Sequence, residues 1–238
     1  MGMETSLRQY ALGESLVASP HSVVGCLPTM ADVRAYEEKE SRVWSALEGG
    51  YPRFVEHVWV RELKAFYIER AGLEITDAAL LRGEPALASL TDLLGGDFRS
   101  LEVEPGLFLV WLEGAADSKA LMKYIQHTGC GISSREAEDW LVQHGLQASV
   151  FEEATYAGDA DAAVRSELAR LTGAKPSEIW PCASGMNAFY GAFRAIQSVQ
   201  RARGRRRWLQ LGWLYVDSGS ILEKYLGAGE GLEICRRV

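Results

Sequence analysis

The sequence predicts an α/β protein in which a mostly helical N-terminal region precedes the start of a parallel, doubly wound sheet. Two observations carry this prediction. In the first half, apolar residues recur at helical spacing and glycines end the segments. In the last third, short apolar segments alternate with helical ones. We therefore expect a mostly helical region with one short buried strand over 1–150, and the opening part of a larger α/β domain over 151–238.

Helices account for most of the first region. Amphipathic spacing predicts helices over 31–47 and 55–71, separated by a break at Pro52, and the stretch 73–100 is expected to be helical as well. Residues 107–112 are too apolar and too short for anything but a buried strand. Further helices are expected over 117–129, 133–145 and 159–171, the second of them opened by Ser133 and Glu136 as a capping pair.

The last third reads as strand, helix, strand, helix, strand. The strands are expected at 178–182, 208–214 and 231–235, with helices from 185 to about 202 and from 218 to 226. Right-handed crossovers place the loops that follow parallel strands at the same edge of the sheet. Ligands of open α/β sheets bind at that edge, so we expect the site there.

Composition and charge exclude several classes of protein. The 238 residues are 47% hydrophobic and 24% charged, which is enough apolar material for a folded core. The formal net charge is −7, which argues against a protein that binds nucleic acid over its whole surface. The longest strongly apolar run, 107–112, cannot span a bilayer, so no membrane association is expected.

Cysteine and histidine usage points to a cytoplasmic protein without a metal site. The four cysteines are far apart and form no C-x-x-C pair, which argues against a zinc site or a disulfide framework and fits a reducing compartment. The four histidines show no metal-binding spacing. Charged residues within the first thirty positions interrupt any signal-peptide pattern.

The turn Ser184-Gly185-Met186 is the strongest candidate site. It lies where a predicted strand meets a predicted helix, so unpaired amides and the positive end of the helix dipole favour an anion there, and Gly185 lets a phosphate approach the backbone. The alternative is a glycine that serves packing alone. Tyr215, expected at the end of the next strand, would reach the same edge, where its ring could stack on a planar cofactor or simply be half-buried.

These motifs resemble the cystathionine γ-synthase-like enzymes of cysteine and methionine metabolism. The resemblance starts from Ser184-Gly185-Met186-Asn187-Ala188 and Tyr215-Val216-Asp217-Ser218. Three more stretches are similar to the branch typified by fungal cystathionine γ-synthases, namely Leu27–Val33 continuing to Glu38, Gly50–His57 and Gln126–Arg135. Together they cover roughly residues 20–227.

The resemblance implies a cofactor and a fold. It implies pyridoxal 5′-phosphate (PLP) and the aspartate-aminotransferase-like fold type I, a three-layer αβα sandwich of which the chain would hold an incomplete part. The backbone amides of the Ser184 turn, those of Gly185 and Met186, would hold the cofactor phosphate, and Tyr215 would stack on the pyridine ring. Arg135 is the nearest counterpart of an arginine that reaches the phosphate of a neighbouring subunit, although the tyrosine of that Tyr-x-Arg motif is missing here.

The resemblance also implies what the chain should lack. The family's Schiff-base lysine lies downstream of the tyrosine motif, and none of the six lysines has that context. PLP chemistry needs such a lysine. We therefore expect no catalytic residue in this chain, and an incomplete fragment of an enzyme that replaces the γ-substituent of an O-acyl-homoserine by cysteine. The intact family member would act on small amino-acid substrates.

Two other functions remain open from the sequence. The chain could be a non-catalytic fragment that uses its helical N-terminal region to associate with a full-length paralogue. As partners we expect a second copy of the chain, in a homo-oligomer, or a complementing C-terminal half. Alternatively, the five arginines between Arg201 and Arg207 could bind RNA. A plainer interpretation of that run is that its cations close a helix by complementing the negative end of the helix dipole.

Overall fold

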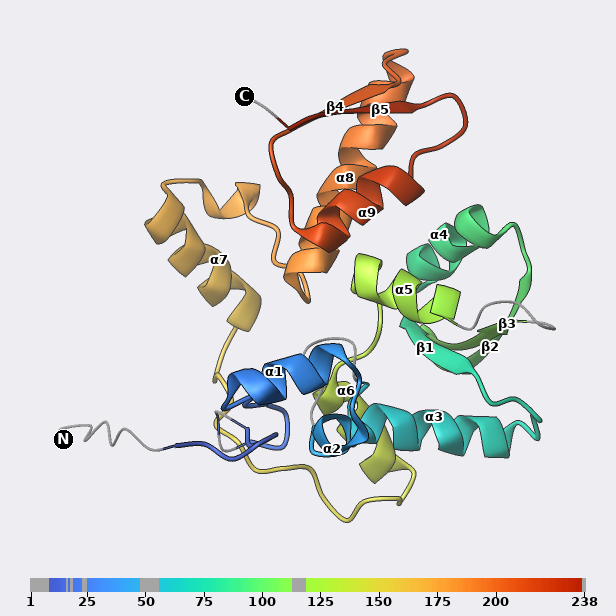
Figure 1. Ribbon diagram of the computed structural model, residues 1–238, viewed down its shortest axis with the longest axis vertical. Helices are drawn as coiled ribbons and strands as arrows, with labels where there is room; N and C mark the ends of the chain where they lie inside the picture. Colours follow the sequence, from blue (N-terminus) through green and yellow to red (C-terminus); the bar gives the residue numbers. More distant parts are fainter. Residues whose placement is uncertain are drawn as a thin grey trace. The chain divides into compact units, whose positions relative to one another are not determined.

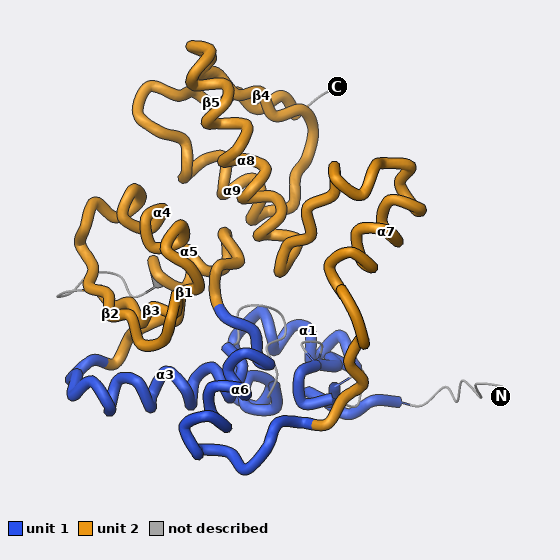
Figure 2. Tube along the Cα trace, turned by 180° about the vertical axis from the view of Figure 1, so that it is seen from behind, with its two compact units in different colours: residues 1–75, 132–151 blue, residues 76–131, 152–238 orange. Residues whose placement is uncertain are grey.

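The computed structural model describes residues 9–15, 17, 19–22, 25–47, 56–112 and 119–236, the side chain of Lys119 excepted. The chain forms two compact units (Figure 2). The first comprises Met1–Ile75 and Ile132–Phe151, and the second comprises Thr76–Gly131 and Glu152–Val238. The fold is mixed α/β, as predicted (Figure 1). The predicted division into 1–150 and 151–238 and the three-layer sandwich stay predictions.

The first unit is helical within its described residues. It contains α1 (Met30–Glu37), α2 (Ser41–Trp44), α3 (Val58–Arg70) and α6 (Ser134–Gln143). The single helix predicted over 31–47 is wrong, because Lys39 adopts a positive φ of 59° and separates α1 from α2. The predicted helix over 55–71 is confirmed as α3, and Ser133 caps α6 as expected by accepting a hydrogen bond from the Glu136 amide at 3.1 Å. The segment Gly50–Val55 of the resemblance lies outside the described residues.

A buried polar cluster holds the first unit together. The His21 side chain is 1% exposed, and its Nδ1 lies 3.0 Å from the Ser134 hydroxyl while its Nε2 lies 3.2 Å from Glu138. The other oxygen of Glu138 accepts a hydrogen bond from the Phe151 amide at 2.8 Å. These contacts join the segment before α1 and the chain after α6 to the same helix.

The second unit contains an antiparallel sheet of order β1-β3-β2. Its strands are β1 (Ala78–Arg82), β2 (Phe98–Glu104) and β3 (Leu107–Leu112), and α4 (Glu84–Leu94) joins the first two. The helix predicted over 73–100 is therefore wrong, whereas the buried strand over 107–112 is confirmed. Residues 78–81 form an apolar run that pairs with β3, and this pairing overrides the local helical pattern.

The rest of the second unit consists of helices and a two-stranded parallel sheet. Its elements are α5 (Lys119–Thr128), α7 (Ala160–Thr172), the short 3₁₀ helix η1 (Pro176–Glu178), α8 (Gly185–Ala202), β4 (Arg207–Leu211), α9 (Val216–Lys224) and β5 (Gly231–Cys235). β4 pairs in parallel with β5, and α9 connects them. The strand predicted over 178–182 is wrong: Pro176 starts a 3₁₀ turn, and Trp180 is 77% exposed.

One hydrophobic core organises the second unit. Its buried side chains come from β1, β3, α4, α5, α8 and α9 and include Leu81, Leu90, Phe108, Val110, Tyr124, Phe193 and Ile221. α8 runs along one face of the β4–β5 pair (Figure 1), where the rings of Phe193 and Trp208 lie 5.0 Å apart between centroids. Helix α8 is therefore anchored between the core and the parallel strands.

Across the described part of the chain, no helix combines the length and apolar character that crossing a bilayer requires.

Candidate functional site

The N-terminus of α8 is built by a serine cap. Ser184 is in the extended conformation, with φ −156° and ψ 166°, and its hydroxyl accepts a hydrogen bond from the Asn187 amide at 3.1 Å. Its carbonyl starts the helix by accepting from the Ala188 amide at 2.9 Å. The cap satisfies the third helical amide, and among the described residues nothing accepts a hydrogen bond from the amides of Gly185 and Met186. Two N–H groups therefore remain for a ligand.

The two amides lie at the surface of the unit, next to a side chain that is buried in the hydrophobic core. Ser184 and Gly185 are exposed, and a Cβ added to Gly185 would meet no atom within 4 Å. The Met186 side chain is 6% exposed and belongs to the hydrophobic core. Because α8 is 18 residues long, its dipole adds positive potential at this end. The arrangement suits a phosphate or another oxyanion.

Tyr215 lies at the start of α9 and not at the end of the preceding strand. β4 ends at Leu211, and Tyr215 is the N-cap of α9, with φ −55° and ψ 140°. Its side chain is 55% exposed, and Trp213 and Val216 beside it are 81% and 76% exposed. The start of α9 thus presents an exposed aromatic and apolar segment.

The C-terminal end of α5 brings these two helix starts together. The Asn187 side-chain amide donates to the Thr128 carbonyl at 2.9 Å, which joins α8 to α5. Two residues earlier on α5, the Gln126 side-chain amide donates to the Asp217 carboxylate at 3.0 Å, which joins the first turn of α9 to the same helix. The structure therefore places Ser184, Gly185, Met186 and Tyr215 around a common support.

Arg135 belongs to the other compact unit. It lies on α6, in the first turn after the Ser133 cap, and it is exposed. The Ser184 turn lies in the second unit. The proposed contribution of Arg135 to a phosphate site stays a prediction.

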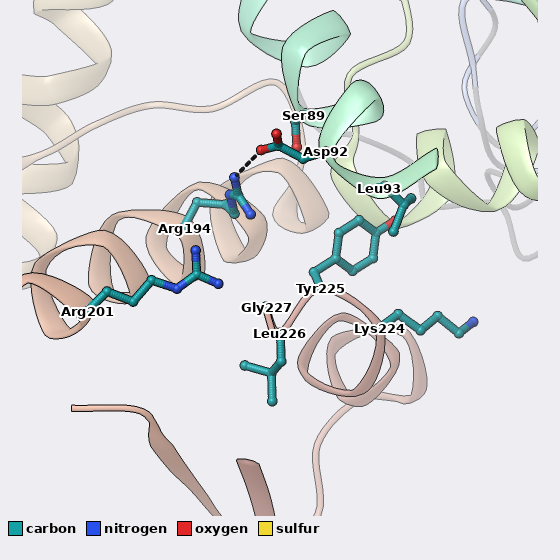
Figure 3. A pocket seen from close by; sticks show the side chains of 9 residues that line it. All are labelled: Ser89, Asp92, Leu93, Arg194, Arg201, Lys224, Tyr225, Leu226 and Gly227. Atoms are coloured by element: carbon teal, nitrogen blue, oxygen red, sulfur yellow. Dashed lines mark hydrogen bonds and ion pairs between the residues drawn. The ribbon is translucent and has the colours of Figure 1, made fainter. Parts of the chain in front are cut away.

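A separate pocket of about 290 Å³ lies toward the opposite end of α8 (Figure 3). Arg194 and Arg201 enter it from α8, and Arg194 pairs with Asp92 of α4 at 3.3 Å. In this view the Lys224 ammonium points away from the two guanidinium groups. At about 1.5 Å per residue, Arg194 and Arg201 lie roughly 14 and 24 Å from Gly185 along the axis of α8. No residue of the Ser184 turn lines the pocket, so the pocket is distinct from that turn.

Arg201 is engaged in a buried network. Its guanidinium donates two hydrogen bonds to Glu230, at 2.9 and 2.7 Å, and the Glu230 side chain is 1% exposed. The Gln197 side chain and the Gly227 amide also donate to Glu230, each at 2.7 Å. The hydrogen bond from Arg201 is the largest cause that lowers the pKa of Glu230 to about 2. The network joins the end of α8 to the turn before β5.

The remaining arginines of the 201–207 run follow the end of α8. The Arg205 side chain donates to Gln200 at 3.3 Å, and Arg207 pairs with Glu233 across the parallel strands at 3.6 Å. Two of the five arginines thus pair with glutamates.

The described residues contain no group of three or more histidine, cysteine, aspartate or glutamate side chains placed to hold a metal ion. Among the cysteines, Cys130 follows α5, and its sulfur lies 2.9 Å from the Thr128 hydroxyl oxygen. Burial raises the pKa of its thiol to about 11, so this cysteine is not activated as a nucleophile.

Comparison with known proteins adds two relatives. The chain is 36% identical over 213 residues to the L-2-amino-4-chloropent-4-enoate dechlorinase/desaturase of Streptantibioticus cattleyicolor, a match that covers 87% of this chain and 42% of that protein. It is 28% identical over 140 residues to a provisionally named cystathionine gamma-synthase of Saccharomyces cerevisiae, with 50% of this chain and 21% of that protein covered. The chain thus spans less than half the length of either relative. No family model matches the sequence, and no solved structure matches it.

These matches confirm the resemblance to cystathionine γ-synthase-like proteins that the motifs indicate. The structure adds residues in contact with the candidate site to which sequence reasoning gave no role: Gln126, Thr128, Gly129, Asn187 and Asp217. All five lie inside the stretches that carry the resemblance. That location was the available signal, but pairing them across the fold required tertiary contacts.

Proposed function

Because the chain is similar to cystathionine γ-synthase-like proteins over most of its length, we propose that it forms the phosphate- and ring-binding part of a PLP site. The observation that carries this proposal is the pair of unengaged amides, those of Gly185 and Met186, at the exposed start of α8. They would donate to the cofactor phosphate, and Tyr215 would stack on the pyridine ring.

The residues present fit the group. A phosphate needs several donors and room to approach the backbone closely, and Gly185 leaves open the space that a Cβ would fill. A flat heteroaromatic ring needs an exposed aromatic face, and Tyr215 is more than half exposed. When bound, PLP would supply an electron sink that stabilises negative charge on a substrate amino acid.

The names of the relatives suggest the substrate class. The dechlorinase is named for a 2-amino acid that carries chlorine on carbon 4, which is its γ-carbon. A cystathionine γ-synthase is likewise named for chemistry at that carbon. We propose that the complete enzyme acts on an L-2-amino acid with a leaving group on the γ-carbon. As the specific reaction we propose that the cysteine sulfur replaces the acyloxy group of an O-acyl-homoserine, which leaves as a carboxylate while the thiol gives up its proton.

The chain by itself is proposed to bind the cofactor without catalysing this reaction. Lys175 is exposed and lies 3.8 Å from Glu178, and Lys224, the last residue of α9, lines the pocket that Arg194 and Arg201 enter. These locations support the proposal that neither of the two serves as the Schiff-base lysine. The lysine that PLP enzymes require would come from sequence other than these 238 residues.

A binding experiment with non-aldehyde probes tests the proposal. Pyridoxine 5′-phosphate and pyridoxine differ only in the phosphate and cannot react with surface lysines. We expect the phosphate ester to bind more tightly than pyridoxine, and inorganic phosphate to compete with it. Replacing Gly185 by Asp places a carboxylate in the first turn, which favours the helix but repels phosphate, so we expect binding to weaken about ten- to a hundredfold without loss of stability.

Two matched variants complete the experiment. Tyr215→Phe keeps the ring and should bind as the wild type does, whereas Tyr215→Ala should weaken both pyridoxine compounds. Gly191 lies on the same helix with open space around it, so Gly191→Ala should leave binding unchanged. Equal affinity for pyridoxine and its phosphate ester would contradict the proposal. A single lysine that borohydride fixes specifically to added PLP would contradict the prediction that the chain lacks its own Schiff-base lysine.

A second candidate function is supported by the exposed apolar surface of the parallel strands. Leu209 and Leu211 on β4 are 59% and 60% exposed, and Trp213 follows them at 81%. In the described residues β4 pairs with β5 alone. We therefore propose, as the alternative, a partner-binding chain that associates with a full-length paralogue, with a complementing half or with itself. Co-purification with such a paralogue in the absence of cofactor binding would favour this function.

A further inference from the structure

The two helix starts of the proposed cofactor site share one support, the C-terminal end of α5. We propose that Gln126, Thr128 and Gly129 are positioning residues that set the two ends of this site separately. In this proposal Thr128 and Gly129 fix the phosphate end, and Gln126 fixes the ring end. The inference rests on the proposed function and deepens it.

The phosphate end is fixed by close backbone contact. The Asn187 side chain donates to the Thr128 carbonyl at 2.9 Å, while the Asn187 amide donates to the Ser184 hydroxyl at 3.1 Å. Thr128 is itself 1% exposed, and its hydroxyl donates to the Tyr124 carbonyl at 2.7 Å. The cap of α8 is thus held by a carbonyl that has little freedom to move.

Gly129 makes this contact possible. Its φ is +63°, a conformation that other residues adopt at a cost. A Cβ on Gly129 would lie 2.6 Å from the Ser184 hydroxyl oxygen, 2.9 Å from Asn187 Cβ and 3.0 Å from the Asn187 nitrogen. Any side chain there would push the Ser184 cap, and with it the two unengaged amides, away from α5.

The ring end is fixed by a side-chain contact. The Gln126 amide donates to the Asp217 carboxylate at 3.0 Å. Asp217 is 7% exposed and lies in the first turn of α9, two residues after Tyr215. Because Tyr215 is the N-cap of that helix, the orientation of the first turn decides where its ring is presented.

The two contacts use different atoms of α5, so each end can be disturbed alone. In Gly129→Ala the added methyl group displaces the Ser184 cap but leaves the Gln126 contact. In Gln126→Leu the hydrogen bond to Asp217 is lost but the glycine remains. A role confined to general stability would instead weaken every ligand in parallel with the loss of folding free energy.

Three probes read the two ends: inorganic phosphate reports on the α8 amides, pyridoxine on the ring, and pyridoxine 5′-phosphate on both. For Gly129→Ala we expect about tenfold weaker binding of inorganic phosphate and of the phosphate ester, with pyridoxine unchanged. For Gln126→Leu we expect severalfold weaker binding of pyridoxine and of the phosphate ester, with inorganic phosphate unchanged.

Additional variants guard against misfolding. Asn187→Ala removes the side-chain bond to Thr128 without adding bulk or a strained φ, so it should reproduce the selectivity of Gly129→Ala if that variant does not fold. Met122→Ala changes a partly exposed position of α5 outside these contacts and should leave all three affinities unchanged. The folding free energy of each variant is measured by urea denaturation alongside binding.

The outcomes separate the two proposals. If the wild-type chain binds pyridoxine 5′-phosphate no better than pyridoxine, the proposed cofactor site is wrong and the positioning role falls with it. If the wild type does discriminate but the variants weaken all probes equally, or none, the positioning role alone is overturned. Opposite selectivity of the phosphate-end and ring-end variants supports it.

Discussion

The two sheets of the second unit show how similar apolar strands can reach opposite degrees of burial. β3 carries a continuous apolar run, is paired on both edges by β1 and β2, and is buried over its first four residues. β4 also carries Trp208, Leu209 and Leu211, but only Trp208 packs against the core. Leu209 and Leu211 are about 60% exposed on the other face.

The difference lies in what covers each strand. One face of β1 and β3 contributes Leu81, Phe108 and Val110 to the core shared with α4, α5, α8 and α9. The β4–β5 pair is covered by α8 on one face, and polar contacts such as the Arg201–Glu230 network hold its end. Parallel sheets are ordinarily covered on both faces. The open face of the β4–β5 pair is therefore where a bound partner would bury the most additional apolar surface.

The largest expected effect comes from truncating one leucine in each of the two sheets. Leu81→Ala in β1 removes a fully buried side chain from the core and should lower the free energy of unfolding by about 3 to 4 kcal/mol. Leu209→Ala in β4 removes a side chain that is 59% exposed and should change it by less than about 0.5 kcal/mol. Urea denaturation of both variants measures the contrast, and equal losses would show that β4 is covered in solution.

As the pH falls, we expect the parallel β4–β5 sheet to lose stability before the antiparallel β1-β3-β2 sheet does. The pKa of Glu230 is lowered from its ordinary value of 4.5 to about 2, chiefly by the hydrogen bond from Arg201. The ionised carboxylate therefore stabilises the fold in full above about pH 4.5, and this stabilisation is lost as the pH falls from about 4.5 toward 2. The loss amounts to up to about 3 kcal/mol. Hydrogen exchange between pH 5 and 2.5 should show amides of β4 and β5 losing protection while β1 and β3 remain protected.

The matched variant for this effect is Glu230→Gln. It should be less stable than the wild type at neutral pH, and the acid-dependent loss should shrink because no carboxylate remains at that position. A wild-type acid profile that the substitution leaves unchanged would mean that other carboxylates control the transition.

Association should depend on the exposed face of β4 with little effect on folding. Replacing Leu209 and Leu211 by Lys removes the apolar surface, and because both side chains are already mostly exposed the free energy of unfolding should change by less than about 1 kcal/mol. Sedimentation velocity of the wild type should show concentration-dependent self-association that the double variant lacks. A wild type that stays monomeric at every concentration would show that this face needs a different partner.

The smallest expected effect is a gain of stability within α8. Gly191 lies in the middle of this helix with no atom within 4 Å of an added Cβ, so Gly191→Ala should raise the free energy of unfolding by about 0.5 to 1 kcal/mol. Thermal denaturation measures the change. A loss of stability would mean that this face of α8 is packed more tightly than the described contacts indicate.

Local signals predicted several elements correctly because their causes are local. The Ser133 cap, the helix that starts at Gly185 and the strand at 107–112 depend on hydrogen-bonding side chains and apolar spacing within a few residues. The helix predicted over 73–100 failed because the run at 78–81 forms a strand only through its pairing with β3. The strand predicted over 178–182 failed for the complementary reason, since no neighbouring strand pairs with it in the described structure.

The sequence by itself determined the mixed α/β character, the family resemblance and the capped, glycine-containing helix start at Ser184, because each is encoded in contiguous residues. Only the tertiary structure decided that Gln126 meets Asp217 and that Thr128 and Gly129 meet the cap of α8, since these contacts join residues far apart in the chain. It also decided which face of β4 stays exposed. Hydrogen bonds and burial between distant segments depend on how the helices pack, and spacing along the chain carries no record of that packing.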